Sequence, residues 1–196
     1  MRLHEKIEIR LISTNHVLDM LNDHIDLGVK INPLAGDEVM MTQVGKMRMV
    51  VCASPEYLAA KPCPSIPEDI TDHETITFSR SCDQAVWSFN TSDGKSTEIQ
   101  VKSKLVVNTA EAVVESALRG SGLTQLYLYQ AAPQIESGEL KIILQDFEIS
   151  AVPVCLAIPK GQNSPQKVKV FIDFTKPLLE QQLQMLNQKK PSRQSS

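Results

Sequence analysis

A chain of 196 residues is long enough for one large domain or for two small lobes, and its 42% hydrophobic and 22% charged residues are typical of a soluble globular protein. Its formal net charge of −3 disfavours DNA binding by this chain alone, because autonomous nucleic-acid binders present a positive field to the phosphates. Neither an N-terminal signal peptide nor a run of about 18 apolar residues occurs, so we expect a cytoplasmic protein that does not bind membranes.

The first quarter of the chain predicts strands and one helix. Apolar and charged residues alternate over 7–12, which is the period of a half-buried strand. Ser13-Thr14-Asn15 then offers helix-capping side chains before apolar residues at helical spacing, and the alternation returns over 27–31. Together these segments predict a βαβ unit. A longer extended stretch over 39–54 follows, with a bend expected at Gly45.

The middle of the chain carries helix starts and a turn. Ser54 followed by Pro55 is typical of a capped helix start, because proline fits the first helical position. Asp93-Gly94 is a turn signal between extended segments and predicts a hairpin. Asn108, three residues before Glu111, resembles a capping box and predicts a helix through the apolar stripe that follows.

The last third alternates strands with helices. Extended segments are expected over 123–129, 140–144 and 152–158, with one helix between the first two. Ser164-Pro165 repeats the cap-plus-proline pattern and opens a final helix, which we expect Pro177 to kink or interrupt. The alternation of strands and helices indicates an α/β fold.

No catalytic, metal or cofactor motif emerges from the sequence. The four histidines lie near no Gly-x-Ser-x-Gly motif, and none pairs at the spacing of a zinc helix. The four cysteines form no Cys-x-x-Cys pair, and the eight glycines assemble neither a phosphate loop nor a dinucleotide motif. We therefore expect no enzyme, no metal and no cofactor.

Several motifs, in order along residues 1–180, resemble the effector-binding (substrate-binding) domain of bacterial LysR-type transcriptional regulators. The most specific run is Cys52-Ala53-Ser54-Pro55-Glu56-Tyr57-Leu58, and Trp87-Ser88-Phe89, Gly120-Ser121-Gly122-Leu123 and Phe171-Ile172-Asp173-Phe174 follow at similar spacing. The resemblance implies two Rossmann-like α/β lobes joined by two crossing strands, the fold of type 2 periplasmic binding proteins. The polar run Thr124-Gln125-Leu126-Tyr127-Leu128 departs from the family's more apolar run and implies a different pocket chemistry.

The resemblance also implies a division of the chain. Lobe one comprises 1–48 and 160–186, lobe two comprises 49–159, and 187–196 is expected to be a disordered tail. Family members begin with a winged helix-turn-helix, a linker helix and the first strand and helix of lobe one. None of these precedes Met1 in this sequence, so we expect an N-terminally truncated chain whose first lobe is incomplete.

Two-lobed binders hold their ligand beyond the carboxyl ends of strands. Hydroxyl, amide and guanidinium groups at such positions make the candidate effector-binding residues Ser13, Thr14, Asn15, Ser79, Arg80, Asn108 and Thr109. Helix capping by Asn15 and Asn108, and an ordinary exposed arginine at position 80, are the structural alternatives.

The predicted function is sensing of a small-molecule effector, a small anion or an aromatic acid. The chain would control transcription only within a parent protein whose N-terminal domain contacts DNA. Family members form homodimers or tetramers, an assembly not expected here because the missing helix belongs to the interface. The alternatives are a free-standing two-lobed solute-binding protein and an inert fragment of a decayed regulator gene.

Overall fold

The computed structural model describes residues 8–14, 20–33, 39–78, 85–91, 93–160 and 165–188. Contacts between residues divide the chain into two compact units. Unit 1 comprises Met1–Gly45 and Pro153–Gln184, and unit 2 comprises Lys46–Val152 and Met185–Ser196.

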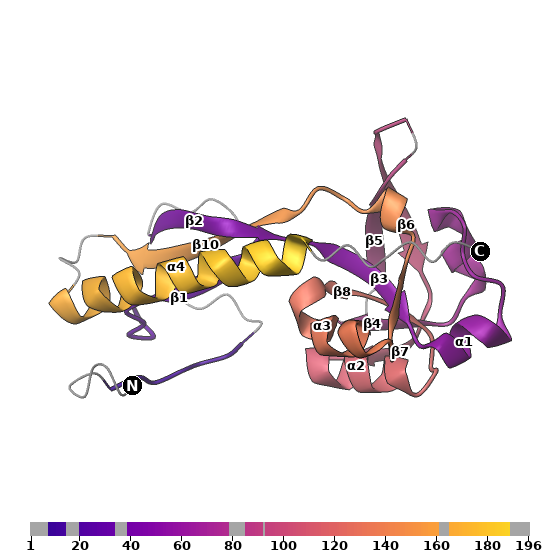
Figure 1. The fold of residues 1–196 in the computed structure, drawn as a ribbon, viewed down its shortest axis with the longest axis horizontal. Helices are drawn as coiled ribbons and strands as arrows, with labels where there is room; N and C mark the ends of the chain where they lie inside the picture. The colour runs from indigo at the N-terminus through magenta and orange to yellow at the C-terminus, as the bar shows by residue number, and fades with distance from the viewer. Residues whose placement is uncertain are drawn as a thin grey trace. The chain divides into compact units, whose positions relative to one another are not determined.

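Unit 1 is built on a three-stranded sheet with one long helix beside it (Figure 1). The strand order is β1–β10–β2, and β1 pairs antiparallel with β10, with Gly28 opposite Ala157. This pairing places residues 153–159 in unit 1, whereas the boundary expected from the family resemblance lies after 159. The elements are β1 (Gly28–Ile31), β2 (Val39–Met47), β10 (Val152–Pro159) and helix α4 (Gln166–Gln188).

Helix α4 approaches strand β2 closely at Gly45. A Cβ atom at this position would lie 2.7 Å from Cδ1 of Leu183, which is buried. Gly45 therefore permits the contact, and the bend expected there is not found: the extended stretch breaks at Arg48 instead. Pro177 lies inside the continuous helix α4, so the predicted interruption does not occur.

The strand and helix expected before β1 are not formed in the described residues. Residues 8–12 lie in no strand, and Leu11 is 88% exposed. Alternation makes a segment suitable for a sheet, but a strand also needs a neighbour for its backbone groups. Residues 20–24 form a turn in which the Ile25 amide donates to the Met20 carbonyl, so this part of the predicted helix is wrong. The remainder, 15–19, lies outside the described residues.

Unit 2 contains a five-stranded mixed sheet in the order β7–β4–β8–β3–β9. Strands β7, β4 and β8 run parallel, while β3 pairs antiparallel with β8 and β9. The parallel strands have long connections, since the hairpin of β5 (Ala85–Asn90) and β6 (Ser96–Val101) lies between β4 and β7 and helix α2 (Ala110–Leu118) lies between β7 and β8. The strands are β3 (Met49–Ala53), β4 (Thr75–Phe78), β7 (Ser103–Val107), β8 (Leu123–Tyr127) and β9 (Lys141–Ile143).

Two core clusters pack in unit 2. One joins helices α2 (Ala110–Leu118) and α3 (Leu128–Ser137) to the sheet, through residues such as Ile76, Val113 and Leu126. The other contains Val51, Leu123 and the hairpin residues Trp87 and Phe89. The shorter elements are α1 (Pro55–Ala60) and the 3-10 helices η1 (Pro67–Asp72) and η2 (Gln145–Phe147). Alternate residues of β3 and β8 thus enter different clusters, as the period of a strand requires.

The predicted hairpin is confirmed as β5 (Ala85–Asn90) and β6 (Ser96–Val101), in which Trp87 lies opposite Ile99. The extended stretch after the Asp93-Gly94 turn is divided at Lys102, so β6 belongs to the hairpin and β7 to the large sheet. The predicted start of α1 is also confirmed, since the Tyr57 amide donates to Oγ of Ser54.

His73 links α1 to the beginning of β4. Its Nδ1 lies 3.1 Å from the Tyr57 hydroxyl, which also accepts a hydrogen bond from the Glu74 amide. Burial lowers the pKa of His73, and the nearby Lys61 lowers it further, whereas Asp69 and Asp72 act in the opposite direction. The neutral ring is therefore the form that the fold favours.

This depressed pKa predicts a pH-dependent stability. Because the folded state binds fewer protons, the contribution of His73 is fully present above its unfolded pKa of about 6.5 and is lost as the pH falls below it. Urea denaturation at about pH 7 and pH 5 should show a larger loss for the parent chain than for His73→Gln. Equal losses in both proteins would contradict this assignment.

Candidate functional site

The carboxyl ends of β4, β7 and β8 meet at one edge of the five-stranded sheet. Phe78 lies opposite Val107, and the register of β4 with β8 places Tyr127 towards the same edge. A cavity of about 420 Å³ opens here, within the size range of small-molecule sites. It is lined by Met49, Thr77, Phe78, Ala85, Val86, Trp87, Gln125, Leu126, Tyr127 and Gln130. We call it the edge cavity.

Three aromatic side chains contribute to the wall of the edge cavity: Phe78, Trp87 and Tyr127. Trp87 is only 4% exposed and packs in a core cluster. This part of the cavity wall is therefore a buried side chain of the hairpin. Trp87 is also the single tryptophan of the sequence. Its fluorescence can therefore report on this cavity alone.

The polar groups of the edge cavity are uncharged and held in place. Nε2 of Gln125 donates to the Ser88 carbonyl at 3.4 Å, and Oε1 of Gln130 accepts from the Tyr127 amide at 2.9 Å. The Thr77 hydroxyl hydrogen-bonds the Ser103 hydroxyl across β4 and β7. The cavity thus combines aromatic surface with a few oriented amide and hydroxyl groups, the usual makeup of a ligand site.

Tyr127 remains protonated in this environment. Burial raises the pKa of its phenol, and the nearby Tyr129 raises it further. The pKa of Tyr129 is likewise raised, first by burial. At neutral pH both hydroxyls can therefore donate hydrogen bonds.

A second cavity of about 360 Å³ lies at the opposite, amino-terminal edge of β4 and β7. Its lining includes His73, Glu74 and Lys104, and Lys104 forms an ion pair with Glu74 at 3.4 Å. Its charged groups thus neutralise each other, and it carries no aromatic wall besides His73. The edge cavity is the better candidate site.

Two of the sequence-predicted site residues lie together, in the link from β7 to α2. Asn108 and Thr109 are both exposed, and neither lines the edge cavity. Thr109 is the residue that caps α2, with its Oγ1 accepting from the Ala112 amide at 3.3 Å. The alternative that Asn108 caps this helix is therefore wrong, because the helix begins one residue later than the capping-box pattern indicates.

The other predicted residues are not brought together with these. Ser13 and Thr14 are exposed and belong to unit 1. Asn15, Ser79 and Arg80 lie outside the described residues. Their roles in effector binding stay predictions.

Replacing Thr109 tests whether this residue caps α2. Thr109→Ala removes the cap and should lower the free energy of unfolding by about 1 kcal/mol, measured by urea denaturation. Asn108→Ala is the matched control and should cost less. A larger loss in Asn108→Ala would contradict the placement of the helix start.

The candidate residues predicted from the sequence do not include those that line the edge cavity. Tyr127 lies in a segment predicted to be extended, Trp87 lies in one of the motifs of the family resemblance, and Gln125 lies in a run that is more polar than the family's usual run. That polarity was the available signal: Gln125 is the one amide side chain in the five residues of β8. Periodicity alone cannot show which end of a strand borders a cavity.

Comparisons with known proteins agree with this architecture. A family model described as the LysR substrate binding domain matches residues 1–180. The transcriptional activator TtdR of Escherichia coli (strain K12) is 25% identical over 184 residues, covering 93% of this chain and 59% of the relative. The chain therefore spans little more than half the length of such relatives, which are named as transcriptional regulators, not as enzymes.

Solved structures show the same fold. The regulatory domain of CrgA, a LysR-type regulator from Neisseria meningitidis, has a TM-score of 0.78 at 20% identity and covers 91% of this chain and 88% of that one. Full-length AphB from Vibrio cholerae has a TM-score of 0.78 at 21% identity, with coverage of 91% and 60%. The predicted α/β fold class, like that of these regulatory domains, is confirmed.

Proposed function

The chain belongs to the LysR substrate-binding-domain family, and from this premise we propose that it senses a small-molecule effector within a longer transcriptional regulator. The relative TtdR is longer than this chain, and we propose that a segment of the longer protein outside the matched region contacts DNA. A ligand that binds two states of the regulator unequally shifts their populations, which is how binding would alter transcription.

The edge cavity is the observation that carries the assignment of an effector site. It lies where α/β sheets usually bind ligands, at the carboxyl ends of parallel strands, and its wall combines aromatic rings with oriented amides. Asn108 and Thr109 follow β7 at the same edge of the sheet, and we propose that they border the site. Ser13, Thr14, Asn15, Ser79 and Arg80 remain part of the proposal from the sequence.

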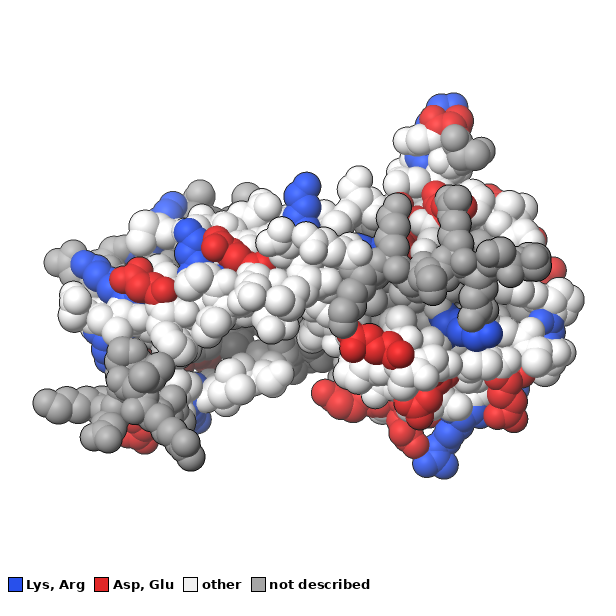
Figure 2. Space-filling model, viewed as in Figure 1, with Lys and Arg blue, Asp and Glu red and all other residues white. Residues whose placement is uncertain are grey.

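The charge distribution supports DNA contact through another segment. On the face shown in Figure 2, the described basic and acidic side chains are interspersed. The whole sequence has a formal net charge of −3. Phosphate binding requires a concentration of positive charge, so this domain is proposed to act on DNA only through its parent.

The described residues give little reason to propose other chemistry. Among them, no three histidine, cysteine, aspartate or glutamate side chains lie close enough to hold a metal ion. Burial raises the pKa of the Cys52 thiol to about 12, so it stays protonated and unreactive at neutral pH. In the same part of the chain, no helix is both long and apolar enough to cross a membrane.

Ligand screening with a blocked cavity tests the proposal. A panel of aromatic acids, aromatic amides, flavonoids and small carboxylates is added to the chain, and thermal midpoint and Trp87 emission are recorded. Ala85→Leu fills the edge cavity from its wall, and Ala60→Leu adds the same volume at an exposed position of α1. We expect at least one compound to shift both readouts in the parent and in Ala60→Leu, but not in Ala85→Leu.

Two results would contradict the proposed site. The first is a complete absence of response across the panel. The second is a response of equal size in Ala85→Leu, which would place the ligand outside the edge cavity.

A further inference from the structure

The wall of the edge cavity is assembled from segments that are far apart in the sequence. Besides two residues of β4, it is formed by Met49 at the start of β3, by residues within 125–130 at the junction of β8 and α3, and by 85–87 of β5. The sheet order joins β3, β4 and β8, but β5 belongs to a separate two-stranded sheet. Strand pairing therefore does not fix the distance between the hairpin and the rest of the wall.

Two backbone carbonyl groups hold the two sides of this wall. The Arg48 carbonyl accepts a hydrogen bond from the Leu128 amide at 2.9 Å. Arg48 directly precedes Met49, and Leu128 is the first residue of α3, so this bond joins two of the wall segments. The Glu148 carbonyl accepts a hydrogen bond from Nδ2 of Asn90 at 2.8 Å, and Asn90 is the last residue of β5. Arg48 thus anchors the sheet side of the wall, and Glu148 anchors the hairpin side.

The side chains of the same two residues connect these anchors. Arg48 donates from Nε to Oε2 of Glu148 at 2.8 Å and from Nη2 to Oε1 at 2.7 Å. Two bonds between planar groups fix their orientation as well as their distance. The side chains are largely buried, so water competes weakly for these bonds. One buried ion pair therefore links the hairpin side of the wall to the sheet side.

We infer that the ion pair of Arg48 with Glu148 is a positioning element of the proposed effector site. Neither residue is among the described residues that line the edge cavity, so the pair acts through the anchors on either side of it. Its loss lets the hairpin move relative to the sheet, and the wall then lacks the preformed spacing that favours ligand binding. The inference rests on the proposed function for its ligand, but the position of the wall can be measured without one.

Trp87 provides the measurement, because it is the single tryptophan and lies in the hairpin side of the wall. Acrylamide, a small neutral quencher, is titrated into the folded chain at neutral pH. The double variant Arg48→Met with Glu148→Leu removes the ion pair without leaving a buried charge unpaired. We expect its quenching constant to rise at least about 2-fold, since a wall that opens locally admits the quencher more often. Glu115→Ala, which breaks the exposed pair with Arg119, should leave the constant unchanged.

Removing one anchor gives a test that does not depend on the folding of the double variant. Asn90→Ala deletes the hydrogen bond to the Glu148 carbonyl while the ion pair stays intact, and the quenching of Trp87 should again rise. The matched control is Asn187→Ala. Asn187 donates from Nδ2 to the Lys46 carbonyl at 2.7 Å, a bond of the same kind that involves no lining residue. This control should keep the quenching constant of the parent.

Ligand binding separates positioning from stability. Any compound of the panel that Ala85→Leu blocks is titrated into the parent, the double variant and Glu148→Ala, at a temperature at which all three are folded. We expect the double variant to be more stable than Glu148→Ala and yet to bind at least about 10-fold more weakly than the parent. A pair that contributes only stability would give parent-like binding in every folded variant.

Three results would overturn the inference. Unchanged quenching in the double variant would show that the wall keeps its place without the ion pair. Equal quenching in Asn90→Ala and Asn187→Ala would remove the role of the anchor at Glu148. Parent-like binding in the double variant would restrict the pair to stability. Silence of the whole compound panel, together with the expected quenching, would instead contradict the proposed function and leave the positioning of the wall intact.

Discussion

Replacing Glu148 with alanine should lower the free energy of unfolding by about 3–5 kcal/mol. Glu148 receives two hydrogen bonds from Arg48, Nε to Oε2 at 2.8 Å and Nη2 to Oε1 at 2.7 Å. Both side chains are largely buried, at 15% and 14% exposure, and Nη1 of Arg48 already has no partner among the described residues. The variant would leave a buried guanidinium without its counter-charge. Urea denaturation of the chain measures the loss.

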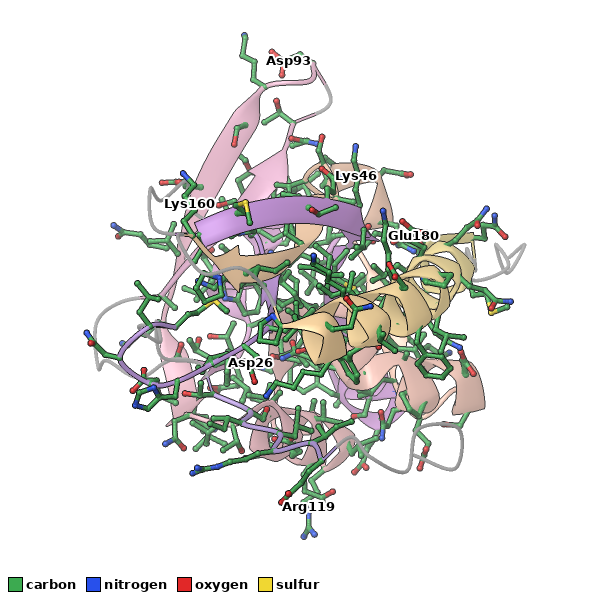
Figure 3. All side chains as sticks on the ribbon, turned by 90° about the vertical axis from the view of Figure 1, so that its left-hand side faces the viewer. Asp26, Lys46, Asp93, Arg119, Lys160 and Glu180 are labelled. Atoms are coloured by element: carbon green, nitrogen blue, oxygen red, sulfur yellow. The ribbon has the colours of Figure 1, made fainter. Side chains whose placement is uncertain are left out.

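An exposed arginine–glutamate ion pair provides the control. Arg119 donates to Glu115 at 2.7 Å, but these side chains are 76% and 59% exposed, and Figure 3 shows Arg119 at the periphery of the molecule. Glu115→Ala should therefore change stability by about 0.5 kcal/mol or less. The double variant Arg48→Met with Glu148→Leu should recover part of the loss, because it removes both charges. Equal losses in Glu148→Ala and Glu115→Ala would contradict this account.

Gly122→Ala should destabilise the chain by at least about 3 kcal/mol. Gly122 has a φ of +151°, and a Cβ atom there would lie 2.4 Å from the Glu74 carbonyl oxygen. This oxygen belongs to the backbone and accepts the Leu123 amide at 2.9 Å, so it cannot move away without breaking the junction of β4 and β8. Thermal and urea denaturation measure the effect.

Gly138 separates steric conflict from backbone strain. Its φ of +81° is also in the left-handed region, but no atom lies within 4 Å of the position of its Cβ. Gly138→Ala should therefore cost only about 1–2 kcal/mol, the strain of an alanine in that conformation. If both variants lose the same stability, the contact with Glu74 is not what requires glycine at position 122.

Features that depend on a few neighbouring residues were predictable from the sequence. Ser54 before Pro55 indicated the start of α1, and Asp93-Gly94 indicated the hairpin, because caps and turns are formed by side chains and backbone within a few positions. Motifs in order along the chain also identified the family, because their order and spacing can be compared directly with those of a known family. At Asn108 the local pattern was less sharp, and the helix cap shifted by one residue to Thr109.

Features that depend on distant partners were not predictable in this way. The alternation over 8–12 indicated a strand, yet a strand forms only when another backbone pairs with it, and none does among the described residues. The ion pair of Arg48 with Glu148 likewise joins residues one hundred positions apart in the chain. The spacing of residues within one segment does not reveal such pairs.

By itself, the sequence determined the α/β class, the family, most element starts and the lack of a recognisable catalytic motif. Each of these features depends on residues that are close together in the chain or on the order of short motifs. Only the tertiary structure decided that Trp87, Gln125 and Tyr127 share one cavity, since β5 belongs to a separate two-stranded sheet that contacts β8 through core packing and the hydrogen bond from Gln125 to Ser88. The residues chosen from the sequence sat after strands and at helix starts, which is where function is usually sought. The cavity is instead lined by strand ends and by a hairpin whose position no local pattern encodes.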